Sequence, residues 1–263
     1  MLSVAAFGAR RVYVRMPEPI PPSAALSYWL SQRDAVSWLQ TLPDASIDLV
    51  VTDPPYESLE KHRAVGTTTR LSHSKASSND WFTVFPNARF RELFWQVHRV
   101  MRKNTHFYLF CDQETAFIAK PIAEEVGFKF WKPLIWHKLA IGMGYHYRST
   151  YEMILFFEKG KRKLNDLGIS DVIAEKRIHK GYPTEKPVRV NEILITQSTV
   201  PGELVIDPFM GTASAGVAAL GQGRHFWGND ISDKALTIAE ERLAKSGGLR
   251  HSSSPFVQRP MLF

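Results

Sequence analysis

The chain has 263 residues, 44% of them hydrophobic, and a formal net charge of +7 at pH 7. This length and apolar content suffice for one substantial α/β domain, and the basic charge favours a polyanionic partner. Cys111 is the single cysteine, which excludes an internal disulfide and any metal site that needs two thiolates. No apolar stretch approaches the ~18 residues of a membrane-spanning helix, so we expect a soluble protein.

The chain divides into a catalytic domain at 24–246 between two flexible ends, at 1–23 and 247–263. Four prolines between Pro17 and Pro22 predict the end of the N-terminal extension. Within the domain, apolar periodicity predicts strands at 26–30, 47–52, 105–110, 130–136, 151–157, 204–206 and 226–229, and helices at 35–42, 87–101, 114–126, 191–196, 213–221 and 234–243. This alternation is typical of a doubly wound, mostly parallel α/β sheet.

Two polar segments interrupt the alternation. The segment 57–86 is long and rich in Ser and Thr, which favours a mobile loop at an active site or against DNA. The segment 159–182 is short and basic, and its charge indicates either target recognition or an ordinary solvated face.

Two motifs directly follow predicted strands: Asp53-Pro54-Pro55-Tyr56, and Asp207-Pro208-Phe209-Met210-Gly211-Thr212. Open α/β sheets bind ligands at the carboxyl ends of their strands. The first motif offers rigid hydrogen-bond acceptors and an aromatic face, which suit a planar base with an amino group. The second leads into a helix, whose free N–H groups can meet a polar ligand. Asp230 follows after roughly 20 residues, the interval at which nucleotide sites place an acid against ribose hydroxyls.

In this order the two motifs resemble those of the amino-group DNA methyltransferases, in the beta-class permutation. The resemblance runs from about Trp29 to Leu243. It implies a Rossmann-like fold, S-adenosylmethionine as cofactor, double-stranded DNA as partner, no metal, and a location in the cytoplasm of a bacterium or archaeon, or in a phage-infected cell. A tetrad beginning with Asp is more typical of adenine enzymes, so we expect methylation of adenine N6 on a flipped-out base.

Three alternatives stay open: methylation of cytosine N4, action on RNA, and a non-catalytic DNA-binding module. The resemblance assigns the target base to Asp53, Pro54, Pro55 and Tyr56. It assigns the cofactor to Asp34, Thr184, Lys186, Asp207, Pro208, Phe209, Gly211, Thr212 and Asp230. Thr184 and Lys186 are expected near the methionine carboxylate of the cofactor, with a helix cap and a surface charge as their ordinary alternatives. Ala213 stands where the family often has a second glycine.

The basic residues expected at DNA are Lys61, Arg63, Lys138, Arg148, Lys161, Arg162 and Lys180. Relatives with this motif order often pair, so a homodimer is a further expectation. The end of the chain, Gln258 to Phe263, resembles peptides that dock on bacterial sliding clamps. A tail packed on its own domain is the alternative for these residues.

Overall fold

The computed structural model describes residues 2–7, 10–15, 25–58, 83–142, 147–178 and 185–251. Near the N-terminus, β1 (Leu2–Phe7) and β2 (Arg10–Arg15) pair antiparallel as a separate two-stranded sheet. Within the described ranges, no helix combines the length and hydrophobicity that crossing a membrane requires.

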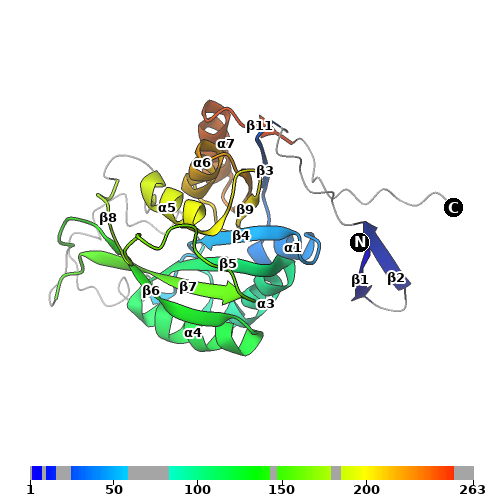
Figure 1. The fold of residues 1–263 in the computed structure, drawn as a ribbon, viewed down its shortest axis with the longest axis horizontal. Coiled ribbons are helices and arrows are strands. Elements are labelled where there is room, and N and C mark those ends of the chain that lie inside the picture. The colour runs from blue at the N-terminus through cyan, green and yellow to red at the C-terminus, as the bar shows by residue number, and fades with distance from the viewer. Residues whose placement is uncertain are drawn as a thin grey trace.

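The main sheet has nine strands in the described part of the chain, in the order β11-β3-β10-β9-β4-β5-β7-β6-β8 (Figure 1). Their bounds are β3 (Ser27–Ser31), β4 (Ile47–Thr52), β5 (Met101–Cys111), β6 (Lys129–His137), β7 (Tyr151–Lys159), β8 (Val172–Ala174), β9 (Leu204–Asp207), β10 (His225–Asn229) and β11 (Leu249–Arg250). The strands from β11 to β5 run parallel, whereas β7 is antiparallel to both β5 and β6. The predicted doubly wound, mostly parallel sheet is therefore confirmed, with β7 as the reversed strand.

Helices cover both faces of this sheet. They are α1 (Ala35–Gln40), the 3-10 turn η3 (Asn87–Arg89), α3 (Phe90–Val100), α4 (Gln113–Val126), α5 (Val188–Ser198), α6 (Ser214–Gly221) and α7 (Asp233–Lys245). Figure 1 shows α3 and α4 on one side of the sheet and α5, α6 and α7 on the other. Two hydrophobic clusters correspond to these two layers, and neighbouring residues of β4 divide between them, Val50 to the first and Val51 to the second.

Local sequence explains the ends and faces of these helices. The side chains of Asp34 and Asp112 accept backbone N–H groups in the first turns of α1 and α4, which is the capping role such residues favour. Gly127 ends α4 in the left-handed conformation, at φ +113°. The apolar stripe of α3 is fully buried, and its Phe94 ring lies 5.8 Å from that of Phe107 in β5.

The direction of β7 decides which residues share an edge of the sheet. Because β4, β5 and β9 are parallel, their carboxyl ends lie at one edge. In the antiparallel pairing, Met153 near the start of β7 faces Cys111 at the end of β5, and Lys159 faces Thr105. The start of β7 therefore lies at the carboxyl edge of the parallel strands, and its end lies at the opposite edge.

Candidate active site

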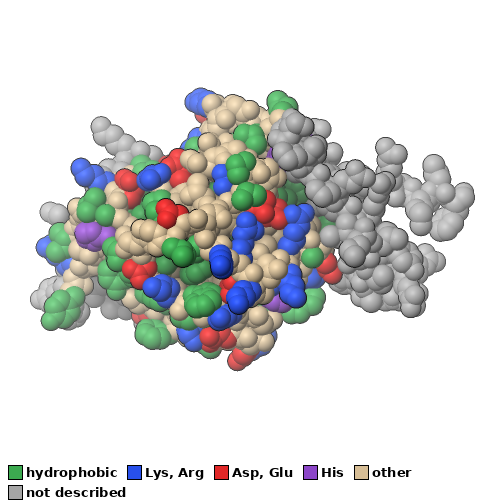
Figure 2. Space-filling view, viewed as in Figure 1, with side chains coloured by type: hydrophobic (Ala, Val, Ile, Leu, Met, Phe, Trp, Pro, Cys, Tyr) green, Lys and Arg blue, Asp and Glu red, His purple; other side chains and the backbone are tan. Residues whose placement is uncertain are grey.

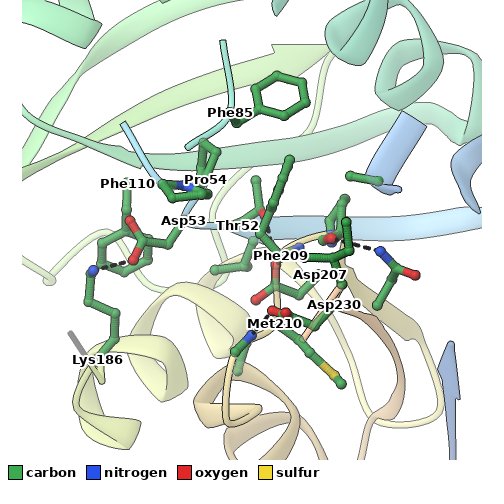
Figure 3. Close-up of a pocket in the computed structure, with 18 of the residues that line it drawn as sticks. Thr52, Asp53, Pro54, Phe85, Phe110, Lys186, Asp207, Phe209, Met210 and Asp230 are labelled. Carbon is green, nitrogen blue, oxygen red and sulfur yellow. Dashed lines mark hydrogen bonds and ion pairs between the residues drawn. The ribbon is translucent and has the colours of Figure 1, made fainter. Parts of the chain in front are cut away.

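A cavity of about 520 Å³ opens at the carboxyl edge of β4, β5 and β9, within the ~300–1,000 Å³ range of small-molecule sites. Both sequence motifs line it (Figure 3). The predicted residues that the structure brings together around this cavity are Asp34, Asp53, Pro54, Pro55, Tyr56, Lys186, Asp207, Pro208, Phe209, Gly211, Thr212 and Asp230. Segments about 150 residues apart in sequence thus form one site.

At one end of the cavity, Asp53 is the centre of a hydrogen-bonded group. Its carboxylate accepts the hydroxyl of Tyr56 and one N–H of the Lys186 ammonium group. Burial, reinforced by the Asp53 charge, raises the pKa of Tyr56 well above its ordinary value, so the phenol stays protonated. The carbonyl of Pro55 accepts the backbone N–H of Phe85 at 2.9 Å, which ties the tetrad to the segment before α3.

The ion pair between Asp53 and Lys186 is part of a longer chain of charges. Lys186 lies 3.4 Å from Glu152 at the start of β7, and Glu152 lies 2.6 Å from Lys138. Burial opposes the charge of Lys186, but Asp53 and Glu152 outweigh it and raise its pKa. Burial likewise opposes the charge of Glu152, but Lys186 and Lys138 lower its pKa. Two carboxylates and two ammonium groups therefore alternate along this chain, and Asp53, Lys186 and Glu152 line the cavity.

At the other end, Asp207 is held from two sides. Its Oδ1 atom accepts the hydroxyl of Thr52 at 2.6 Å and the backbone N–H of Phe209 at 3.0 Å. Burial raises the pKa of Asp207 to about 7, although both hydrogen bonds act against this rise. Asp207 therefore titrates close to neutral pH at the floor of the cavity.

Asp230, at the end of β10, organises the glycine turn. Its Oδ2 atom accepts the backbone N–H of Gly211 at 2.9 Å, and its Oδ1 atom accepts that of Ser232 at 2.8 Å. Gly211 has φ +51°, a conformation that favours glycine, and a Cβ atom there would meet no other atom within 4 Å. The turn thus leaves open space beside an acidic side chain.

Aromatic rings and an ion pair form the remaining wall. The rings of Phe85 and Phe209 meet edge to face with centroids 5.0 Å apart, and the Arg89 guanidinium lies 5.1 Å from the Phe85 centroid. Arg89 also donates to both carboxylate oxygens of Asp34, at 2.7 and 2.9 Å. This bidentate contact lowers the pKa of Asp34 to about 2. Asp34 is therefore a cap of α1 and an ion-pair partner at once.

The structure also shows what the predicted cofactor residues contact besides the cavity. Thr212 accepts from Arg242 of α7 through its carbonyl at 2.9 Å and its hydroxyl at 2.7 Å, and Arg242 lies 2.8 Å from Glu185. Lys186 contacts Asp53 and Glu152. Thr184 lies outside the described residues.

The residues predicted at DNA divide between the two edges of the sheet. Arg148 is exposed, and Lys138 near the cavity is paired with Glu152. Lys161 and Arg162 follow the end of β7 at the opposite edge, where Arg162 pairs with Glu203 at 3.0 Å. Figure 2 shows Lys and Arg side chains gathered in the region of α1 and α3. Lys61, Arg63, Lys180 and the segment Gln258 to Phe263 lie outside the described residues.

Four residues that line the cavity were not expected at the site from the sequence: Thr52, Phe85, Arg89 and Asn229. The Asn229 amide is buried and donates to the carbonyls of Arg33 and Pro208, at 3.0 and 3.1 Å. A polar residue at a strand end was the available signal for Thr52 and Asn229. Glu152 begins a strand, so its place at this edge depends on the direction of that strand.

A family model described as DNA methylase, of the N6 and N4 type, matches residues 47–241. The chain belongs to the N6/N4 DNA methylase family. It is a methyltransferase of DNA amino groups, and this family uses S-adenosylmethionine as its cofactor. The cavity fits this cofactor, because the Asp230 carboxylate, which can accept ribose hydroxyls, lines it beside the open space at Gly211.

Individual relatives agree with this membership. YubD of Escherichia coli strain K12, itself named only as a candidate methylase, is 27% identical over 216 residues, which cover 81% of this chain and 88% of YubD. Among solved structures, the M1.HpyAVI complex with S-adenosylmethionine has a TM-score of 0.61 at 21% identity, covering 82% of this chain and 99% of the other. The cytosine-N4-specific PvuII DNA methyltransferase has a TM-score of 0.61 at 14% identity, covering 88% and 99%. These two structures share the fold of this chain.

Proposed function

We propose that this methyltransferase transfers a methyl group to the N6 atom of an adenine flipped out of double-stranded DNA. One observation carries the proposal: Asp53, Pro54 and Tyr56 line the same cavity as Phe209 and Asp230. A base held at the first group would therefore face a cofactor held at the second. Bringing two reactants into one oriented site removes much of the entropic barrier to a bimolecular reaction.

At the base end, the tetrad supplies acceptors for an amine that is a poor nucleophile, because its lone pair is delocalised into the ring. Asp53 and the Pro54 carbonyl each accept one N–H of this amine, which orients the nitrogen toward the cofactor. Tyr56 lines the cavity beside them, and we assign its ring to stacking on the base. Stacking and these hydrogen bonds offset the few kcal/mol that flipping costs.

At the cofactor end, Asp230 accepts from the ribose hydroxyls, Phe209 packs on the cofactor and Asp34 lies near its adenine ring. The open space beside Gly211 lets the cofactor approach the backbone. When bound, S-adenosylmethionine supplies an electrophilic methyl group carried on a sulfonium. The amine that accepts this methyl group must lose a proton, and the carboxylate of Asp53 is the acceptor in contact with it.

The choice of adenine rests on the aspartate that begins the tetrad, which the family resemblance associates with adenine. The acceptor pair itself would hold the amino group of cytosine equally well, because both bases carry an exocyclic NH₂ beside a ring nitrogen. If the product is N4-methyldeoxycytidine, the proposed target base is wrong but the methyltransferase activity stands.

The test is methyl transfer from tritiated S-adenosylmethionine to unmethylated genomic DNA, followed by mass spectrometry of the nucleosides. We expect N6-methyldeoxyadenosine as product and competition by unlabelled DNA rather than RNA. Asp53→Ala should abolish transfer and leave cofactor binding, measured by calorimetry, nearly intact.

Asp171→Ala is the matched control, because this exposed carboxylate also pairs with a lysine, Lys132 at 2.8 Å, and lies outside the cavity. It should retain transfer. Full transfer by Asp53→Ala would end the assignment of the tetrad. Cofactor uptake without product on any DNA would instead favour a non-catalytic binding module.

A further inference from the structure

We propose that Lys186 is a positioning residue for Asp53, and that Glu152 holds Lys186 in place for this task. The inference rests on the proposed function of Asp53 and assigns Lys186 to the base end of the cavity. From the sequence, Lys186 was expected to meet the methionine carboxylate of the cofactor.

The Lys186 side chain is held against Asp53. Figure 3 shows Lys186 extended toward Asp53 beside Phe110, with the ammonium group directed at the carboxylate. Its Nζ atom lies 3.4 Å from Glu152 and 5.5 Å from the centroid of the Phe110 ring. The side chain is 11% exposed. A lysine in this position has lost most of its rotamer freedom, so it fixes the carboxylate that it contacts.

Glu152 holds the ammonium group of Lys186 in this place. Its Oε2 atom is buried, makes no hydrogen bond among the described residues, and faces Nζ in the ion pair with Lys186. Its Oε1 atom is held by Lys138 at 2.6 Å. Glu152 is therefore anchored by Lys138, the residue directly after β6, and offers its second oxygen to Lys186.

The charges around Asp53 affect its pKa in opposite directions. Burial raises the pKa of Asp53 above its ordinary value; Lys186 acts against this rise, and Glu152 adds to it. The titratable groups around Asp53 come from several elements: Lys186 before α5, Glu152 from β7, Tyr56 after β4, Cys111 at the end of β5 and Asp207 at the end of β9. Lys186 is the one cation in this described set. It is therefore the group that opposes protonation of Asp53 beside a second carboxylate.

The experiment is a pH profile of methyl transfer in a single turnover, with enzyme in excess over genomic DNA and with saturating S-adenosylmethionine. The acid limb of this profile is the part in which the rate falls as pH decreases. In Lys186→Met it should move to higher pH by ~1–3 units, because an adjacent opposite charge usually lowers the pKa of a carboxyl group by that much and the variant lacks this charge. In the double variant Lys186→Met/Glu152→Gln part of this shift should be reversed, because the second carboxylate is gone. Lys186→Arg should keep the limb near that of the wild type.

Two further measurements separate this role from others. Lys120→Met is the matched control, because Lys120 also pairs with a glutamate, Glu124 at 2.7 Å, but on α4. Its profile should equal that of the wild type. The cofactor dissociation constant of Lys186→Met, measured by calorimetry, should change less than twofold.

An unmoved acid limb in Lys186→Met would overturn the inference, and a large loss of cofactor affinity would return Lys186 to the methionine carboxylate. If Lys186→Met does not fold, Glu152→Gln alone decides, and its limb should move to lower pH. A wild-type protein that methylates no DNA would refute the proposed function itself, which is a different result from an unmoved limb.

Discussion

The hydroxyl of Thr52 donates to Oδ1 of Asp207 at 2.6 Å, across 155 residues of sequence. Thr52 is the last residue of β4 and Asp207 the last of β9, and the two strands are parallel neighbours. This bond links the strand that presents the base-binding tetrad to the strand that presents the cofactor turn. Both groups are buried, so the relative position of the two halves of the site depends on it.

Replacing Thr52 by valine should destabilise the protein. The change preserves the shape of the side chain but removes the donor to a buried carboxylate, which costs about 1–3 kcal/mol. Urea denaturation measures the loss, and Thr52→Ser, which keeps the hydroxyl, is the control. Equal stability of the valine and serine variants would show that the bond contributes little.

Asp207 should make stability depend on pH. Burial raises its pKa from 3.8 to about 7, so the fold favours the protonated carboxyl. The resulting stabilisation is fully present below the unfolded pKa and is lost as pH rises through about 7. Asp207→Asn cannot titrate but keeps an acceptor oxygen.

The wild type should therefore lose free energy of unfolding relative to Asp207→Asn as pH rises from about 4 to about 7. Parallel denaturation curves at several pH values measure this difference. A difference that stays constant with pH would show that Asp207 has an ordinary pKa.

Replacing Ala213 by glycine should lower the free energy of unfolding less than the same replacement within α6. The sequence predicted Ala213 inside the start of this helix, but the structure places it before the helix with φ +57°, where a Cβ atom is strained. Ala218, within α6, is equally buried. Both substitutions remove a buried methyl group, so their comparison isolates the backbone effect.

We expect Ala218→Gly to lower the free energy of unfolding by about 1–2 kcal/mol more than Ala213→Gly does. Thermal and urea denaturation of the two variants give the comparison. Equal losses would mean that the left-handed conformation of Ala213 carries no cost.

Asp230→Asn should weaken cofactor binding at least about tenfold, the loss expected when a charge-assisted hydrogen bond becomes a neutral one. The amide oxygen can accept the N–H of Gly211, but the NH₂ group cannot accept that of Ser232, so the variant loses one of the two hydrogen bonds of the turn. Calorimetry with S-adenosylmethionine measures the affinity. Asp233→Asn, an exposed carboxylate at the start of α7, is the control and should bind normally.

Much of the cofactor end could be predicted from local sequence. Asp207, Gly211 and Asp230 follow strands that were predicted from short apolar runs, and parallel strands bring such ends together. Asp34 was expected at the cofactor, and the structure shows it lining the cavity, capping α1 and pairing with Arg89. Nothing in the local pattern around Arg89 indicated this contact, because it spans 55 residues.

The sequence by itself determined the family, the alternation of strands and helices and the two motifs, because these depend on short-range periodicity and on residue types at fixed spacing. The tertiary structure decided the direction of β7, since apolar periodicity is the same in either direction along a strand. That direction brings Glu152 to Lys186 and carries Lys161 and Arg162 to the far edge. The electrostatic environment of Asp53 is therefore a property of the folded sheet.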